Sequence, residues 1–385
     1  MNFKVVSCLQ KFLWLAFLGG VLSIALGANV GRTAGTEIGE FNRRATATTQ
    51  LLAGIMPTPP EPAFARLIES DAWKEHQKWM ISQWSQVRGR LATMEAWRER
   101  EVKVTGEQRK TLLYPFSGPD FLNAYTLFPS HGRYIFFSLE RPGSLPDMES
   151  VTSTQFIKIL NDVRSAFRDI FERNYFITSY MTKQLTTPWV RGTVPVMATM
   201  MALMNRRIVR IEPIDLFPEL ARIYDAPDSN RPRLLLRGVR IDFANPAMPG
   251  TQQLYYFSLD AADRALEYYP EFIPWVGQHK PATALIKSAS YLLHDGQFAK
   301  TRSMLLESTD LVVQDDTGIP YRFLSQTPWH VKLYGKYHKP IRPMEYAYQK
   351  DLEAAFSANP DQPDLPFPFG YHWRGKQSVL ILARR

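Results

Sequence analysis

The sequence predicts an α/β protein with a mixed, largely parallel central sheet that is flanked by helices and extended by an antiparallel hairpin insertion. Four short runs, residues 112–116, 134–139, 311–313 and 379–383, are apolar without alternation. Such runs are typical of strands in the middle of a sheet covered on both sides, because a sheet covered on one side alternates apolar and polar residues. We therefore expect these four segments to be neighbouring inner strands of one sheet.

The helices around this sheet are predicted from the spacing of apolar residues. Residues 121–128 have helical spacing and join the first two runs, and a strand–helix–strand unit of this kind begins a parallel sheet. A long helix is expected after Ser70 and Asp71, which can cap it. Its apolar stripe comprises Trp73, Met80, Trp84, Val87, Leu91 and Met94. Further helices are expected over residues 152–171, 193–204, 281–293, 296–306 and 344–356.

The hairpin insertion is predicted from residues 233–243 and 252–259. Val239 and Ile241 alternate with Arg240 and Asp242, as expected for a strand that is wet on one side. The connection between the two runs contains two prolines and a glycine. These two strands should therefore pair with each other in antiparallel orientation.

The N-terminus has the features of a targeting segment. Lys4 and Lys11 precede the uncharged apolar run 12–28, which is typical of a signal peptide or an N-terminal anchor. We expect a periplasmic or secreted protein, or one that residues 12–28 anchor to the inner membrane. Residues 29–62, first rich in Ala and Thr and then in Pro, predict a flexible spacer. Residues 63–385 are then a single large α/β domain whose first part, 63–105, is helical.

Composition limits the function classes. The chain has 385 residues, of which 45% are hydrophobic, so a sizeable core can be buried. Its net charge is +9, but the basic residues are spread along the chain, which argues against a nucleic-acid partner. The one cysteine, Cys8, precedes the apolar run. A chain cleaved after that run has no cysteine, which excludes disulfides and thiol chemistry.

Polar residues follow the expected inner strands. Ligands of open α/β sheets bind outside the carboxyl ends of the strands, so these residues could share one rim. The loop 370–376 places His372 and Arg374 beside Tyr371 and Trp373, which could stack against an anionic or sugar-like ligand. The candidate ligand-binding residues are Ser117, Asp120, Glu140, Asp315, Asp316, His372 and Arg374.

Three other chemistries have weaker support. Aspartic proteases need two Asp-Thr-Gly loops, and only one triplet, beginning at Asp316, occurs here, so Asp316 is predicted to be structural. No calcium-loop spacing follows Asp315 and Asp316, and His330 and His338 lie eight residues apart, so we expect no metal. Nucleotide-binding and methyl-transferring folds share the strand–turn–helix form, but the glycine-rich fingerprint is absent, so we expect no cofactor.

Four segments carry a resemblance to a known family: LLYPFSGPDFL (112–122), YLLH (291–294), QDDTGIPYRF (314–323) and GYHWR (370–374). They resemble segments of an uncharacterised family of exported bacterial proteins with no assigned activity. The resemblance covers most of the chain after Arg100. It implies an exported protein with a single body, and it implies no catalytic residues.

Three functional hypotheses follow from these observations. The first is an exported protein that binds a small or polymeric envelope ligand at the rim of its sheet. The second is an envelope hydrolase that uses Asp120, Asp315 and Asp316 with His372 as acid–base groups. The third is a structural protein that binds a partner through the tryptophan-rich helix of residues 73–94.

Overall fold

The computed structural model describes residues 40, 42–104, 106, 110–216, 236–342, 344–374 and 378–385. The chain divides into two compact units, residues 1–45 and 46–385, and the fold described below is that of the second unit. The expected signal segment, 1–28, lies outside the described residues.

Part of the expected spacer has regular structure. Residues 46–52 are helical, and Leu51 and Leu52 are fully buried. The indole of Trp73 donates a hydrogen bond of 3.0 Å to the Leu51 carbonyl oxygen, and Nε2 of His76 lies 2.8 Å from the Leu52 carbonyl oxygen. The flexible spacer expected over 29–62 is therefore wrong for this stretch, because its few large apolar residues are buried against the next helix.

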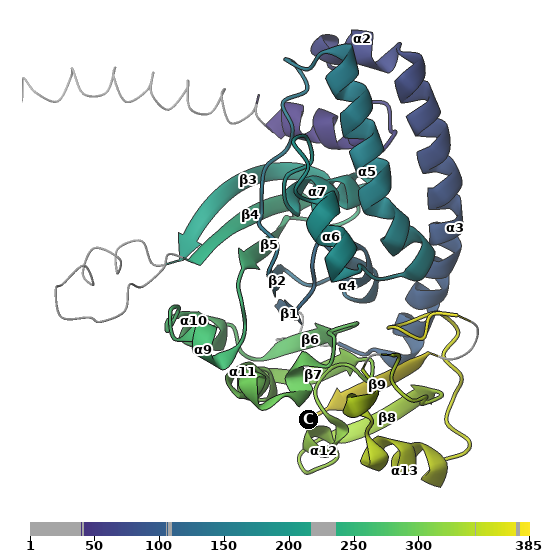
Figure 1. The fold of residues 1–385 in the computed structure, drawn as a ribbon, viewed down its shortest axis with the longest axis vertical. Helices are drawn as coiled ribbons and strands as arrows, with labels where there is room; N and C mark the ends of the chain where they lie inside the picture. Colours follow the sequence, from purple (N-terminus) through teal and green to yellow (C-terminus); the bar gives the residue numbers. More distant parts are fainter. Residues whose placement is uncertain are drawn as a thin grey trace, which may run out of the picture. The chain divides into compact units, whose positions relative to one another are not determined.

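In the described part of the chain, one nine-stranded sheet has the order β3-β4-β5-β2-β1-β6-β7-β9-β8 (Figure 1). The strands are β1 (Thr111–Pro115), β2 (Arg133–Ser138), β3 (Arg207–Leu216), β4 (Leu236–Ala244), β5 (Thr251–Ser258), β6 (Ala282–Ile286), β7 (Thr309–Gln314), β8 (His330–Gly335) and β9 (Val379–Arg384). The five strands from β5 to β7 are parallel, while β3, β4 and β9 join through antiparallel pairs. The predicted mixed, largely parallel sheet with an antiparallel hairpin is confirmed.

The four apolar runs are strands β2, β1, β7 and β9 of this one sheet, but they are not all neighbours. Strand β6 lies between β1 and β7, and β9 runs antiparallel to β7. The helix predicted over residues 281–293 is wrong, because the first part of this range forms strand β6. Residues Ala282–Ile286 are buried throughout and pair with a strand on each side, and this tertiary pairing outweighs weak local propensity.

Helices cover both faces of the sheet. On one face lie α3 (Asp71–Glu101), α4 (Phe121–Leu127), α5 (Ser153–Arg173), α6 (Thr178–Gln184) and α7 (Val194–Leu203), and the other face is covered by α9 (Asp263–Leu266), α10 (Phe272–Gly277), α11 (Ala299–Ser308), α12 (Tyr321–Leu324) and α13 (Lys350–Ala358). Tyr134 of β2 contacts Phe121 of α4, whereas its neighbour Ile135 belongs to the core formed with α10 and α11. Successive side chains along a strand point to opposite faces of the sheet and thus pack into two separate apolar layers.

Side-chain caps fix the starts of three of these helices. Ser70 accepts from the backbone N–H of Trp73 at the start of α3, and Thr152 forms a capping box with Gln155 at the start of α5. Asp120 caps α4. The methionine-rich helix α7 is buried along almost its whole length.

Candidate functional site

The carboxyl ends of β1, β6 and β7 meet at one edge of the sheet, and β9 begins there because it is antiparallel to β7. Segments 117–120, 287–291, 315–317 and 369–374, which are distant in sequence, therefore form one rim. Gly370 lies so close to Asp315 that a Cβ at this position would be 2.2 Å from the carboxylate. The strand order reverses between β1 and β6, which is where doubly wound sheets bind their ligands.

A buried ion pair occupies this switch point. The Nζ atom of Lys287 lies 3.1 Å from Oδ2 of Asp120, and each of these side chains is less than 4% exposed. The hydroxyl of Tyr114 donates to the same carboxylate oxygen at 2.9 Å, and the Asn123 side chain donates to both oxygens. Burial lowers the pKa of Lys287, and the Asp120 charge opposes that shift. The pair is therefore internally satisfied.

Asn174 connects the ion pair to the loop before β9. It ends α5 in the left-handed conformation, with φ of 68°, so its carbonyl oxygen points to Lys287 and accepts a hydrogen bond from Nζ. Its side-chain amide donates to the Pro368 carbonyl oxygen at 2.9 Å. The end of α5, the end of β6 and the loop 369–374 are thus fixed relative to one another.

Asp315 receives its hydrogen bonds from neutral donors. The backbone N–H groups of Ser288 and Thr317 donate to it at 2.8 and 2.9 Å, and the Thr317 hydroxyl donates as well. Burial raises the pKa of Asp315, whereas the hydrogen bonds from Thr317 and Ser288 and the charge of Lys287 act in the opposite direction. This carboxyl group ties the loop after β6 to the loop after β7.

Asp316 has fewer partners than Asp315. Its Oδ2 accepts a 2.6 Å hydrogen bond from the hydroxyl of Tyr291. Burial and the adjacent charge of Asp315 raise the pKa of Asp316 to about 7. The side chain is fully buried, so this carboxyl group has no direct access to solvent.

The segment after β6 is strained. Ser288, Ser290 and Tyr291 have φ values of 53°, 52° and 56°, a region that costs non-glycine residues on the order of 1 kcal/mol or more each. The Tyr371 hydroxyl donates to the Ser288 carbonyl oxygen at 2.9 Å and lies 3.0 Å from Oγ of Ser290. Contacts from Asp315, Asp316 and Tyr371 therefore hold this segment from three sides.

The accessible part of the rim is aromatic and basic. Arg374 is exposed, and its guanidinium carbon lies 4.9 Å from the centre of the half-exposed Trp373 ring. The ring centres of His372 and His338 are 5.7 Å apart. Burial, and then the neighbouring His338, lower the pKa of His372.

The structure brings together only some of the predicted site residues. Asp120 and Asp315 both act on Lys287, and Asp316 adjoins them. Glu140 belongs to another group at the end of β2, where it accepts a 2.6 Å hydrogen bond from the Ser138 hydroxyl. Ser117 donates locally to the Gly118 carbonyl oxygen at 2.9 Å.

Sequence reasoning missed Lys287, Ser288 and Tyr291, because it placed them in a helix. A signal was present. The apolar run 282–286, bounded by Pro281 and a lysine–serine turn, has the same form as the runs that were correctly assigned to inner strands.

The turn at the switch point lacks the glycine-rich fingerprint of nucleotide-binding folds. The order β5-β2-β1-β6-β7 is that of a doubly wound sheet, and β9 lies antiparallel between β7 and β8. However, the turn after β1 has one glycine, Gly118, where a Cβ would meet Sδ of Met181 at 3.0 Å. The buried ion pair of Lys287 and Asp120 lies at the same switch point.

Among the described residues, no group of three or more His, Cys, Asp or Glu side chains is arranged to hold a metal ion. None of the described helices is both long and apolar enough to span a bilayer.

No protein-family model matches this chain, and no curated protein or solved structure matches it significantly. The class that the fold defines is a doubly wound α/β protein with a buried ionic cluster at its switch point.

Proposed function

We propose that the protein is exported and binds a small or polymeric anionic ligand of the cell envelope at the rim formed by residues 288–291 and 371–374. One observation carries this proposal. In the loop before β9, Arg374 is exposed and Trp373 is partly exposed, and both lie on a rim whose own carboxylates are satisfied inside the protein.

The buried carboxylates act as supports for the loops. Asp120 and Asp315 accept hydrogen bonds from Tyr114, Asn123, Ser288 and Thr317, so they hold the backbone in place and leave ligand contact to outer groups. A rigid support is what a binding site on loops requires.

The outer groups favour an anionic, sugar-like ligand. Arg374 stacked on Trp373 presents a flat cation, which suits planar or tetrahedral anions through paired N–H donors. The free part of the indole can pack against a sugar ring. Among the rim residues, Tyr371 is less available, because its hydroxyl is bound to Ser288 and Ser290.

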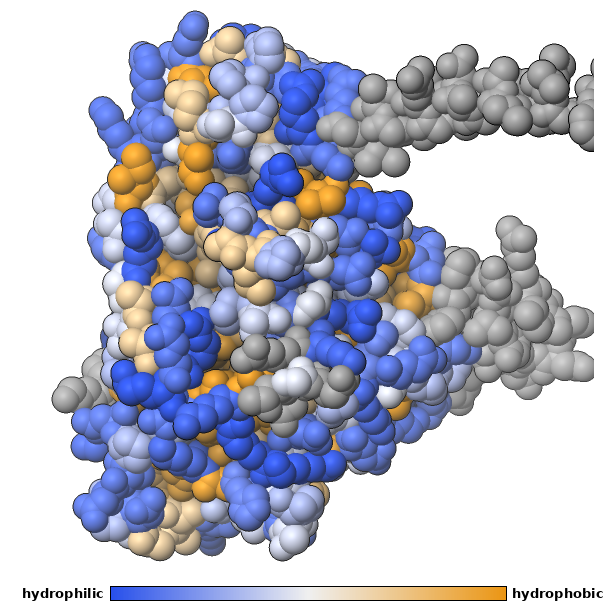
Figure 2. Space-filling view, turned by 180° about the vertical axis from the view of Figure 1, so that it is seen from behind, coloured by the Kyte–Doolittle hydropathy of each residue, from blue (hydrophilic) through white to orange (hydrophobic). Residues whose placement is uncertain are grey.

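The two alternatives have less support. In the hydrolase hypothesis, His372 would act with the carboxylates, but its ring lies against His338 and the backbone of Lys339. In the partner hypothesis, the α3 stripe would be exposed, but Trp73, Met80 and Val87 are buried. Figure 2 shows, on the face it presents, only small groups of hydrophobic side chains among hydrophilic ones.

Calorimetric titration with dextran sulfate, an anionic polysaccharide, tests the site. We expect saturable binding that Arg374→Ala and Trp373→Ala each weaken about tenfold, because each removes a charge-assisted or stacking contact of about 1–2 kcal/mol. Arg88→Ala, which removes an exposed arginine of α3, is the matched control and should bind normally. Equal weakening by all three variants would mean non-specific charge attraction and would refute the proposal.

The export part of the proposal is supported by the uncharged run 12–28 behind Lys4 and Lys11. Expression of the full chain in a Gram-negative host followed by fractionation should place it in the periplasm or at the inner membrane. Full-length protein found only in the cytosol would contradict export while leaving the binding proposal to its own test.

A further inference from the structure

The two outermost strands of the sheet, β3 and β8, differ in how their free edges are protected. Strand β3 contains Pro213, which has no N–H to offer, together with the charged residues Arg210, Glu212 and Asp215. Proline and charge are the usual means by which proteins prevent edge-to-edge pairing. Strand β8 contains no proline, and its Lys332 is paired with Glu101 at 2.7 Å.

The register identifies which groups of β8 face outward. The N–H of Gly335 donates to the Pro363 carbonyl oxygen at 2.9 Å, away from β9, whereas the N–H of Lys336 donates to Ser378, which precedes β9. Inward and outward directions alternate along an antiparallel strand. Val331 and Leu333 therefore direct their N–H and C=O groups outward, and no partner for these groups occurs among the described residues.

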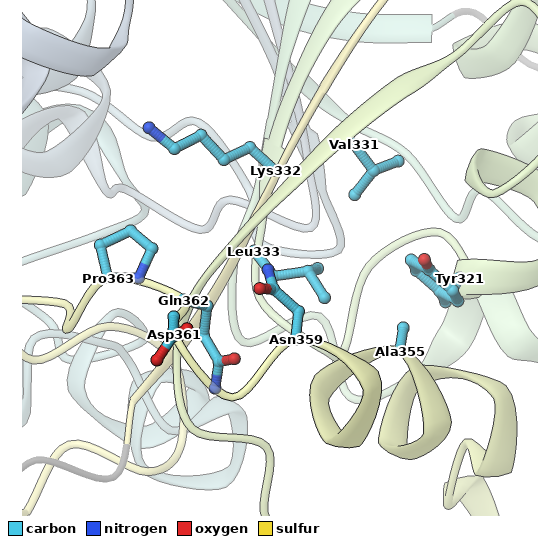
Figure 3. A pocket seen from close by; sticks show the side chains of 9 residues that line it. All are labelled: Tyr321, Val331, Lys332, Leu333, Ala355, Asn359, Asp361, Gln362 and Pro363. Atoms are coloured by element: carbon cyan, nitrogen blue, oxygen red, sulfur yellow. The ribbon is translucent and has the colours of Figure 1, made fainter.

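A groove runs beside these free groups. It has a volume of about 390 Å³ and is lined by Tyr321, Val331, Leu333, Asn359, Asp361 and Gln362, among others. Figure 3 shows Val331 and Lys332 on opposite sides of the strand, with the segment 359–363 facing them. An approaching chain thus meets both unpaired backbone groups and a bounded space for side chains.

We propose that this edge of β8 binds an extended peptide of a partner protein, which adds a strand to the sheet. Only an extended backbone repeats donors and acceptors at the spacing that Val331 and Leu333 present. The exposed carboxylate of Asp361 forms no ion pair within the described part of the chain, so it favours a basic side chain on the peptide. This proposal does not depend on the rim site.

The test uses the full chain and a fluorescein-labelled probe, the hexapeptide Val-Arg-Val-Arg-Val-Arg, in a fluorescence-anisotropy titration. Val331→Pro removes an outward N–H and leaves the ladder to β9 intact, so we expect binding to weaken at least tenfold with unchanged circular dichroism. A fully N-methylated probe should bind the natural chain more weakly than the unmethylated probe, to a similar extent. Asp361→Asn should weaken binding of the arginine-containing probe about threefold. It should leave binding of an analogue with threonine in place of arginine unchanged.

Hydrogen exchange gives an independent measurement if Val331→Pro does not fold. The amides of Val331 and Leu333 should exchange rapidly in the free protein and at least tenfold more slowly with the probe bound. The proposal would be overturned if these amides are already protected in the free protein. It would also be overturned if neither the arginine probe nor its threonine analogue binds at 1 mM. Self-association that Val331→Pro abolishes would also overturn it, since the occupant would then be a second copy of the chain.

Discussion

Asp120 and Asp316 are buried carboxyl groups at the same rim of one sheet, yet they are stabilised in opposite ways. Asp120 is paired with Lys287 and accepts further hydrogen bonds from Tyr114 and Asn123. Asp316 has the Tyr291 hydroxyl as its side-chain donor and Asp315 as a negative neighbour. Two carboxyl groups that are both buried therefore have different partners, a lysine for Asp120 and a hydroxyl with a neighbouring carboxylate for Asp316.

This difference separates two roles for the rim. The Asp120–Lys287 ion pair joins α4, α5 and β6. Asp316, whose pKa is raised to about 7, can gain or lose a proton near neutral pH. Loss of the Asp120–Lys287 pair should destabilise the fold, whereas Asp316 should make stability depend on pH.

The largest effect is expected from Lys287→Met, which keeps the side-chain volume and leaves Asp120 buried without a counter-charge. Removing one member of a buried ion pair typically costs about 3–5 kcal/mol. Urea unfolding should show this loss in the free energy of unfolding. The double variant Lys287→Met with Asp120→Asn should recover part of it, since the uncompensated charge is gone. A loss below about 1 kcal/mol for Lys287→Met would mean that the pair is not desolvated as described.

A smaller effect is expected from Asp316→Asn. The pKa of Asp316 is raised in the folded state from about 3.8 to about 7, so the folded state binds more protons than the unfolded state between these values. The stabilising contribution is complete below about pH 4 and is lost as the pH rises to 7, by at most about 1.4 kcal/mol per pH unit. The carboxamide stays neutral, so the variant should show a flatter pH dependence and greater stability than the natural chain at pH 8.

Thermal unfolding of both proteins from pH 4 to 8 measures this difference. Tyr371→Phe, which removes a hydroxyl at the same rim and no titrating carboxyl, is the control and should keep the slope of the natural chain. Parallel curves for Asp316→Asn and the natural chain would show that Asp316 remains charged throughout. Because the single triplet predicts a structural role for Asp316, this variant should also leave any peptidase activity unchanged.

Local patterns in the sequence were sufficient for much of the fold. The unalternating runs identified β1, β2, β7 and β9, because burial on both faces requires apolar residues throughout. Ser70 marked the start of a helix, since capping is a contact between residues three apart. The hairpin of β4 and β5 followed from alternation and turn residues.

Tertiary structure alone decided where the rim forms and which residues lie at it. Residues 282–286 became a strand because a place between β1 and β7 satisfies their backbone on both sides, and this placement brought Lys287 to Asp120. Val379–Arg384 was identifiable as a strand, but its antiparallel direction, which places Trp373 and Arg374 at the carboxyl edge, depends on pairing with β7. The sequence by itself thus determined many of the elements and their burial, which arise from neighbouring residues, but not strand β6. Strand order and direction, and hence the site, depend on contacts between residues far apart in the chain.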